Sequence, residues 1–370
     1  MIPPPLVSIL RTAVAALAAL SVTTTAHAQE RRADMPVAPS TRDSVALAAA
    51  AVVESGYVFA RKGGEAARVL RRGVRAGRYR PLATASALAD SLSADLSRAA
   101  GDQHLRVVFS VTPLDAPPGQ GRTAADSARD RENAAWRNYG LLQLERLDGN
   151  VGYLELGRFD DPALAGGTLA SAMAFLAGTD ALIIDLRLNG GGHAAMDALL
   201  SSYFIPRPTL LSTLHRRAPG DTAQLWTLAE VPGPRYLDRP VYILVSGRTF
   251  SAAEAFAYDL QALGRAVVVG EKTRGGANPG GWTMLGRHFG VFVPTARVES
   301  AVTHGNWEGT GVRPDLAVAA PNAKAAAHRA ALRRLVAEQA AAGRAPRWRE
   351  ALEMLRADDA RTASASPAPR

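Results

Sequence analysis

Four short apolar runs alternate with helical segments in the second half of the chain, and this alternation constrains the fold more than any other feature. The runs lie at 151–156, 181–186, 241–245 and 265–269. Each is rich in Val, Ile or Leu, as strands buried on both faces are. Helical stretches separate them, at 164–177, 193–204 and 251–263. Strands that alternate with helices predict an α/β domain with a largely parallel central sheet.

The N-terminal part of the chain has a helical pattern instead. Apolar residues recur every four positions, as on one face of a helix, at Leu88, Leu92 and Leu96. The glycine pair at 63–64 and the turn residues at 77–81 are expected to break the segment. We therefore predict three helices over residues 42–100, packed as a small bundle.

The pattern changes again after residue 100. Residues 105–111 alternate between apolar and polar, as in a strand with one buried face. The polar stretch 115–133 is expected to be a long loop or insert, and the Ala-rich residues 322–342 to be a helix. Together these segments predict one α/β core over 101–343.

The first 28 residues have the pattern of an export signal. Arg11 precedes the apolar run 12–22, and the small residues of Ala26-His27-Ala28 fit a cleavage site. The run is shorter than the roughly 20 residues that a membrane-spanning helix needs. We predict cleavage after Ala28, no membrane span in the mature chain, and a periplasmic or extracellular location.

Both ends of the remaining chain are expected to be poorly ordered. Residues 29–41 form a polar lead-in. Residues 344–370 are predicted to be a partly disordered tail, with disorder over the Ala-, Ser- and Pro-rich residues 357–370.

Composition excludes several classes of function. The chain has no Cys, so it has no disulfide, thiolate metal site or Cys nucleophile. The net charge of +9 comes almost wholly from arginines, which are spread along the sequence with few aromatic residues among them. This scatter does not predict nucleic-acid binding. No HExxH pair or complete phosphate-binding loop is present, so we expect neither a metal nor a cofactor.

The segment around Ser251 is the first that could carry chemistry. It joins the apolar run 241–245 to a helical stretch, which places Ser251 at a helix N-terminus. Free N–H groups there favour a developing anion, so Ser251 is a candidate nucleophile with the Ala252 amide as an oxyanion donor. The alternative is structural, because Ser251 and Glu254 also match a capping box.

Two further segments are rich in glycine. Asp185-Leu-Arg-Leu-Asn-Gly-Gly-Gly192 follows a predicted strand, and its glycine amides could supply the other half of an oxyanion hole. It could equally be a tight strand-to-helix turn. Glu308, in Asn306-Trp-Glu-Gly-Thr-Gly-Val-Arg-Pro-Asp315, could orient a histidine or could lie solvated in a surface turn.

Taken together, these segments resemble the tail-specific, or C-terminal-processing, serine peptidase superfamily. The likeness is closest to the branch that contains the tricorn core and interphotoreceptor retinoid-binding protein, and it covers about 45–320. Six motifs occur in family order: GDQHLRV (101–107), NVGYLELGRF (150–159), DLRLNGGG (185–192), TFSAAE (249–254), VGEKTRGGANPGG (269–281) and NWEGTGVRPD (306–315). The resemblance implies a crotonase-like (ClpP/crotonase) α/β core.

The resemblance also implies roles for single residues. The nucleophile would be Ser251, with the amides of Ala252 and of Gly191 or Gly192 as oxyanion hole. In PDZ-bearing members a lysine is the base, but its position here is Gly276. In the tricorn-like members a histidine and a glutamate act, and they match His104 and Glu308.

His104 therefore competes with other candidates for the role of base. Lys272 is the lysine nearest to Ser251 in sequence, and His193 and His304 are the nearest rival histidines. A lysine base requires a strongly lowered pKa, whereas His titrates near neutral pH without any shift. A pH–rate profile with an apparent pKa of about 6 to 7.5 is expected on that ground.

The predicted function is that of an exported serine peptidase acting on a peptide or an unfolded protein segment. No PDZ domain fits between the bundle and the core, so binding by strand addition is not predicted. One alternative is a non-catalytic module that binds retinoid- or fatty-acid-type ligands on the same fold, and another is an esterase. The sequence does not indicate an oligomeric state.

Overall fold

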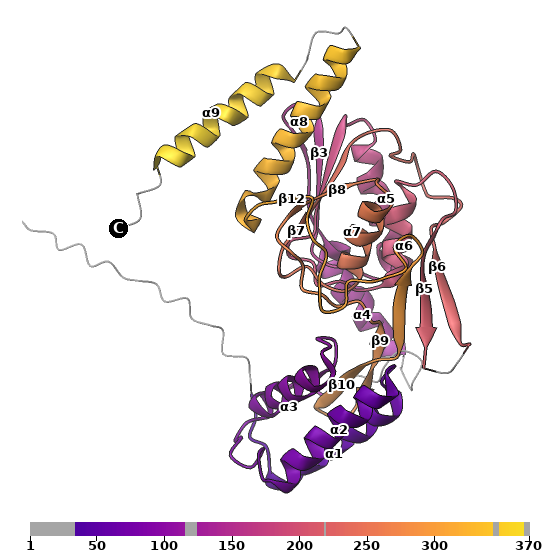
Figure 1. Ribbon diagram of the computed structural model, residues 1–370, viewed down its shortest axis with the longest axis vertical. Coiled ribbons are helices and arrows are strands. Elements are labelled where there is room, and N and C mark those ends of the chain that lie inside the picture. Colours follow the sequence, from indigo (N-terminus) through magenta and orange to yellow (C-terminus); the bar gives the residue numbers. More distant parts are fainter. Residues whose placement is uncertain (1–33, 115–123, 218–219, 343–347, 366–370) are drawn as a thin grey trace, which may run out of the picture.

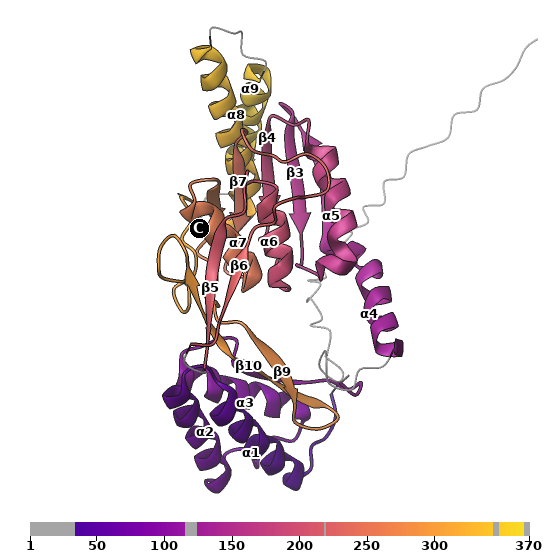
Figure 2. The same ribbon diagram turned by 90° about the vertical axis from the view of Figure 1, so that its right-hand side faces the viewer.

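The structure, a computed structural model, describes residues 34–114, 124–217, 220–342 and 348–365. The N-terminal helices lie at one end and the α/β layers at the other (Figures 1 and 2). The strands β9 (Gly280–Met284) and β10 (Phe289–Pro294) reach from the second part onto the first. This division matters because the candidate catalytic residues come from both parts.

The α/β part is built on a six-stranded sheet of order β12-β8-β7-β4-β3-β2. Every neighbouring pair in it is parallel except β2 with β3. The four predicted strands are present, which confirms the largely parallel sheet. The strands are β2 (Leu141–Leu147), β3 (Val151–Leu156), β4 (Ala181–Asp185), β7 (Val241–Val245), β8 (Val267–Gly270) and β12 (Leu316–Ala317).

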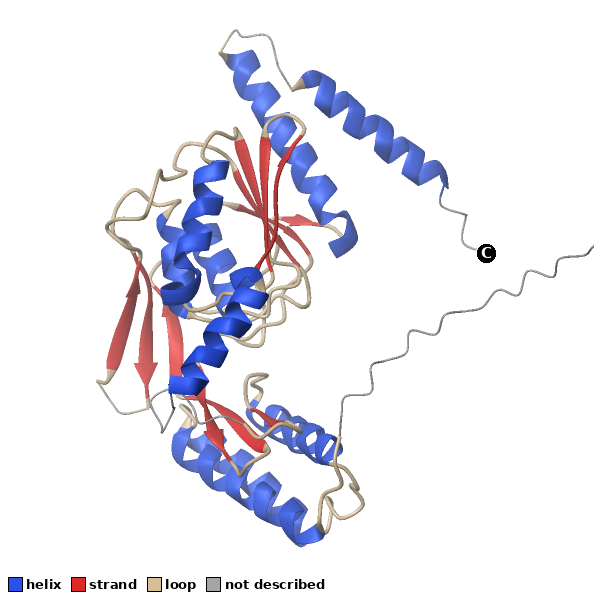
Figure 3. Cartoon of the chain, turned by 180° about the vertical axis from the view of Figure 1, so that it is seen from behind, coloured by secondary structure: helices blue, strands red, loops and turns tan. Residues whose placement is uncertain are grey.

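Helices cover both faces of this sheet (Figures 1 and 3). Alternate strand residues explain the layers: Ile184 and Ile243 belong to the core on one face, Ile183 and Leu244 to the core on the other. The first core includes α5 (Pro162–Leu176), α6 (Ala194–Ser202) and α7 (Ala252–Ala262). The second includes α8 (Ala323–Ala341) and α9 (Arg349–Ala365). Burial on both faces accounts for the unbroken apolar runs in the sequence.

The N-terminal part is the predicted three-helix bundle, with α1 (Pro39–Gly56), α2 (Ala60–Arg75) and α3 (Ala85–Ala100). It shares a hydrophobic core with β1 (Arg106–Phe109) and β10, which pair in the antiparallel sheet β1-β10-β9. The expected break at 63–64 is wrong, because both glycines lie inside α2. A Cβ on Gly63 would stand 2.9 Å from the Val53 carbonyl oxygen, so this glycine permits close helix packing.

Other segments also differ from the expectation. The lead-in is ordered from residue 34, where Pro36 pairs with Thr84, and α1 already begins at Pro39. Half of the predicted polar loop is the helix α4 (Ala124–Trp136); residues 115–123 lie outside the described residues. Part of the predicted disordered tail is α9, which packs on α8 through its apolar side.

A third sheet, β11-β5-β6, extends the α/β part toward the bundle (Figure 2). It consists of β5 (Leu210–Arg216), β6 (Thr222–Trp226) and β11 (Ala296–Ser300), all antiparallel. The predicted export signal and its cleavage site fall outside the described residues. Within the described ranges, no helix has the length and apolar character needed to cross a membrane.

Candidate functional site

Ser251 lies at the N-terminus of α7, on the turn that follows the carboxyl end of β7. Its backbone is unusual: φ is 58° and ψ is −127°, in a region that residues with a side chain rarely adopt. The Ser251 N–H donates to the buried Glu254 carboxylate at 2.9 Å, as in the capping pattern. The Ala252 N–H has no hydrogen-bond partner among the described residues. A strained serine beside a free helix amide fits a nucleophile better than a simple cap.

The glycine turn after β4 lies against this serine. A Cβ on Gly191 would stand 2.7 Å from Ser251 Cβ and 2.9 Å from the Ala252 nitrogen, so only glycine fits there. The Gly191 N–H donates to the Asn189 side chain at 2.8 Å and is therefore occupied. The Gly192 N–H has no partner within the described part of the chain. Of the two predicted glycine donors, Gly192 is the one with a free amide.

His104 reaches the site from the other part of the molecule, between α3 and β1. Its side chain is 5% exposed and packs on the Phe250 ring, with ring centroids 4.3 Å apart. A Cβ on Gly276 would stand 2.7 Å from His104 Cε1, so the loop after β8 also presses against the ring. Since Phe250 precedes Ser251, the predicted base and nucleophile are brought to the same place.

Glu308 is held by main-chain donors in the same loop. Its Oε2 accepts from the amides of Ala277 at 2.6 Å and Asn278 at 3.1 Å. The indole of Trp307 donates to the Gly276 carbonyl, which ties the Glu308 segment to the loop that touches His104. Two predicted residues far apart in sequence, His104 and Glu308, thus meet.

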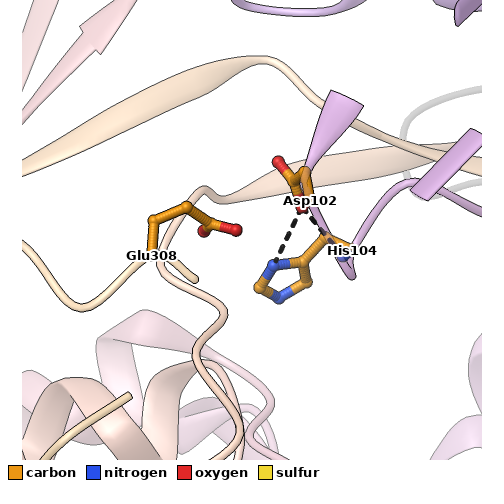
Figure 4. Close-up of side chains that lie close together, drawn as sticks. All are labelled: Asp102, His104 and Glu308. Atoms are coloured by element: carbon orange, nitrogen blue, oxygen red, sulfur yellow. Dashed lines mark hydrogen bonds and ion pairs between the residues drawn. The ribbon is translucent and has the colours of Figure 1, made fainter. Parts of the chain in front are cut away.

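Asp102 is a third member of this cluster and was not predicted (Figure 4). Its Oδ1 accepts the His104 main-chain N–H at 2.8 Å and lies 3.9 Å from His104 Nδ1. Its Oδ2 accepts from the Tyr57 hydroxyl at 3.0 Å. Figure 4 shows both carboxylates, those of Asp102 and Glu308, facing the imidazole. The sequence signal was only an acidic residue two positions before the candidate histidine.

Three buried polar atoms in the cluster have no partner within the described ranges. They are both ring nitrogens of His104 and Oε1 of Glu308. Buried polar atoms are nearly always paired, so such a group marks a site completed by another molecule or by a small movement. It follows that Ser251 and His104 are not hydrogen-bonded to each other here. Catalytic hydrogen bonds often close only when substrate binds.

Burial dominates the electrostatics of the cluster. It lowers the pKa of His104 to about 3, and the nearby charges of Arg106 and Arg274 act in the same direction. It raises the pKa of Glu308 to about 7, with a further contribution from the charge of Asp102. The pKa of Asp102 is also raised by burial. The expectation that His104 titrates near its ordinary value is therefore wrong, because the ring is packed away from water.

Asp102, His104 and Glu308 are the one group of acidic and histidine side chains, among the described residues, close enough to share a metal ion. Their ligand atoms lie within 4.8 Å of one another. In a tetrahedral zinc site with bonds of about 2.0–2.2 Å, ligand atoms lie closer together, at about 3.4 Å. The distance of 3.9 Å between Asp102 Oδ1 and His104 Nδ1 is longer than this, and it fits a histidine flanked by carboxylates better than a closed metal site.

The rival bases lie elsewhere. Lys272, His193 and His304 are all exposed. Lys272 follows β8 on the loop that also carries the buried Thr273, but its own side chain faces solvent. The geometry therefore favours His104 over Lys272 as the base for Ser251.

Sequence reasoning also missed the structural role of Glu254. Its carboxylate is fully buried and accepts four hydrogen bonds, from Ser251 N, Thr273 Oγ1, Gly275 N and Gly276 N. It thereby joins the serine turn to the loop that presses on His104. The capping-box pattern was the available signal, but it indicated a helix cap rather than a link between two loops.

The chain is similar in sequence to known proteases. A carboxyl-terminal-processing protease of Synechocystis sp. is 31% identical over 180 residues, which are 49% of this chain and 40% of that protein. One from Picosynechococcus sp. is 28% identical over 171 residues, 46% of this chain and 40% of that protein. The chain thus spans less than half the length of these curated relatives.

Among solved structures, a mutant of CPAF has the same fold. The TM-score is 0.53 at 12% sequence identity, over 81% of this chain and 98% of that one. At this identity the likeness concerns the fold alone.

Two family models match most of the described residues. The model of peptidase family S41 matches residues 150–318, which contain Ser251 and Glu308. The model of the N-terminal domain of Peptidase_S41 in eukaryotic IRBP matches residues 39–134, which contain His104. The two matches together cover more than half of the chain and agree with the predicted resemblance. The chain therefore belongs to peptidase family S41, a family of serine-type hydrolases.

Proposed function

We propose that this protein is a serine peptidase that hydrolyses peptide bonds through Ser251, with His104 as base and Glu308 as its supporting carboxylate. The observation that carries the proposal is the meeting of the two parts of the molecule. A strained serine lies at a helix N-terminus, and the ring of a buried, unpartnered histidine packs on the residue next to it. The family match supports the same reaction class.

The proposed mechanism begins with the neutral imidazole. A serine hydroxyl needs an adjacent base, and His104 is neutral at working pH because burial lowers its pKa. As Ser251 attacks, its proton moves to a ring nitrogen of His104, and the imidazolium is stabilised by ionised Glu308 and by Asp102. The tetrahedral oxyanion would accept from the free amides of Ala252 and Gly192. His104 then returns the proton to the leaving amine.

The proposal also includes several features that the sequence predicts. They include a crotonase-like core over 101–343, removal of residues 1–28 on export, and a periplasmic or extracellular location. The substrate would be a peptide or an unfolded protein segment. The names of the relatives support proteolysis, but they belong to longer proteins.

Labelling with a fluorophosphonate probe tests the proposal directly, because the probe reacts only with an activated serine. We expect the purified protein to be labelled at Ser251 and to cleave an unfolded protein substrate. Ser251→Ala should remove both signals, while Ser171→Ala, a change at an exposed serine of α5, should remove neither. Absence of labelling in the unmodified protein would instead favour the ligand-binding alternative. Labelling and ester hydrolysis without peptide cleavage would favour an esterase.

A further inference from the structure

A groove of about 1000 Å³ lies beside the candidate site, between α3 and β1. Its walls are partly polar and partly apolar, with Ser93 and Ser97 from the helix and residues 106–109 from the strand. One end is formed by Gln103, Arg106 and Arg274. That end adjoins the cluster, because Gln103 precedes His104 and Arg106 is two residues beyond it.

Neither arginine at this end has an acidic partner in the described part of the chain. The Arg274 Nε donates to the Gln103 side-chain oxygen at 2.6 Å, and its guanidinium lies 4.8 Å from the centre of the Phe250 ring. Arg106 lies 5.6 Å from the centre of the Trp282 ring. Uncharged groups, an amide oxygen and two aromatic rings, therefore hold the two guanidinium groups in place. No carboxylate among the described residues neutralises their positive charges.

The two charges also act on each other. Burial and the charge of Arg274 together lower the pKa of Arg106, so the two positive charges are near enough to repel each other. Asp90 of α3, the one acidic side chain among the described residues of the groove wall, forms no ion pair with either arginine. Two guanidinium groups that line the same groove without a counter-charge make a site for an anion, and planar guanidinium suits a carboxylate in particular.

The edge of β1 limits how a chain could bind in the groove. The N–H and C=O of Val107 are both occupied by the Ser93 hydroxyl, at 2.9 Å each. A strand cannot pair with β1 at this residue. A bound peptide segment would therefore be held through its side chains or its terminus. The charged groups available to it at this end of the groove are the guanidinium groups of Arg106 and Arg274.

We propose that Arg106 and Arg274 form a carboxylate-binding subsite that selects substrates at the groove's inner end. The carboxylate is either an acidic side chain or the free C-terminus of the substrate, since both present the same group. Because Arg274 packs on Phe250, which precedes Ser251, the subsite would lie close to the bond to be cleaved. This inference rests on the proposed peptidase function and adds a substrate preference to it.

Peptide binding to the Ser251→Ala variant, measured by fluorescence anisotropy, tests the subsite without turnover. Three peptides of one sequence are compared: one with a free C-terminus, one with an amidated C-terminus and an internal Glu, and one amidated with Gln in place of Glu. We expect a carboxylate peptide to bind roughly tenfold more tightly than the neutral one, as is typical of a charge-assisted pair. Whichever of the two carboxylate peptides binds more tightly than the neutral one shows whether the subsite recognises a free C-terminus or an acidic side chain.

Adding Arg106→Gln or Arg274→Gln should remove most of that preference, and Arg274→Lys should restore part of it. Arg75→Gln, a change at an exposed arginine of α2, is the matched control and should preserve the full ratio. Equal binding of all three peptides, or a ratio unaffected by both glutamine variants, would overturn the subsite. Probe labelling of unmodified protein separates the two proposals: labelling without a carboxylate preference rejects only the subsite, whereas no labelling and no cleavage rejects the peptidase function.

Discussion

Two glutamates near the nucleophile, the buried Glu254 and the half-buried Glu308, differ in how many hydrogen bonds their carboxylate oxygens accept. Glu254 accepts four hydrogen bonds, two on each oxygen, whereas Glu308 has one oxygen with two main-chain donors and one with no partner in the described residues. The first arrangement satisfies a buried charge and fixes two loops. The second keeps an acceptor beside a histidine that also lacks partners. The comparison suggests that satisfied carboxylates hold this site together, and that unsatisfied ones take part in its chemistry.

The largest effect is expected at the histidine, the centre of the unsatisfied group. His104→Ala should lower kcat/KM by about a thousandfold or more, since the serine loses its base. Lys272→Ala, a change at an exposed residue, should stay within about threefold. Both are measured on one peptide substrate, with circular dichroism as a check on folding. An active His104→Ala protein together with an inactive Lys272→Ala protein would reverse the assignment of the base.

The satisfied glutamate should matter most for stability. Glu254→Gln replaces an oxygen that accepts two hydrogen bonds by an NH₂ group, so donors would face donors in a buried place. We expect the free energy of unfolding to fall by about 3 kcal/mol, the range found when one partner of a buried charged network is removed. Urea unfolding measures this. An unchanged midpoint would mean that the Glu254 network does not hold the two loops.

The unsatisfied glutamate should matter for rate and for its pH dependence. Glu308→Gln is expected to lower kcat/KM by about tenfold to a hundredfold at pH 8, because the imidazolium loses an ionised neighbour. In the unmodified protein the rate should rise with pH as Glu308, with its pKa raised to about 7, loses its proton. The His104 pKa of about 3 lies below this range.

The pH–rate profile between pH 4 and pH 9 separates the two groups. The rising limb near pH 7 should be absent in Glu308→Gln if it reports the carboxyl group. A limb that is the same in both proteins would assign it to another group, with His104 the first candidate once substrate has changed its surroundings.

The sequence was sufficient for the central strands of the parallel sheet, but not for β10, whose apolar run at Phe289–Pro294 was not predicted as a strand. The strands β3, β4 and β7 appeared as unbroken apolar runs because each contributes residues to both cores. The strands β5, β6 and β9 were missed, since polar residues interrupt each of them and none forms such an apolar run. Gly63 was misjudged as a helix breaker because its use, close contact with α1, depends on a neighbour that the local pattern does not contain.

For the site, the resemblance predicted which residues would meet but not how they would be surrounded. His104 and Glu308 lie close together, and His104 packs on Phe250, the residue before Ser251, but their catalytic roles remain predictions. Asp102 was missed because its importance depends on the fold of the chain around it. The lowered pKa of His104 likewise follows from the packing of Phe250 and from two arginines. These contacts join the bundle to the α/β part, and no local pattern encodes them.

A third carboxylate, that of Asp197, tests whether a buried oxygen without a hydrogen-bond partner always belongs to a catalytic group. Asp197 of α6 is fully buried, and its Oδ2 has no partner within the described ranges. Burial raises its pKa to about 7, and burial together with the charge of Asp197 raises the pKa of Asp259 on the neighbouring helix α7. The geometry is that of two carboxyl groups that retain a proton near neutral pH.

The effect of this pair on stability has a definite sign. The folded state binds a proton more tightly than the unfolded state, whose Asp pKa is about 3.9, so stability falls as pH rises from about 4 to about 7 and then levels off. Asn is neutral at every pH, so Asp197→Asn removes the need to keep a proton on this buried carboxyl group. It should therefore raise Tm at pH 8 by a few degrees, at about 2–4 °C per kcal/mol for a domain of this size, and by little or nothing at pH 4. Asp238→Asn, at an exposed position, should change Tm at neither pH.

Because Asp197 is outside the serine, histidine and glutamate group, kcat/KM of Asp197→Asn should stay within about twofold of that of the unmodified protein. A large loss of activity without a change in Tm would show that this pair, too, takes part in catalysis. In that case Asp197, whose oxygen lacks a partner because of packing, could no longer be distinguished from Glu308, whose free oxygen we assign to catalysis.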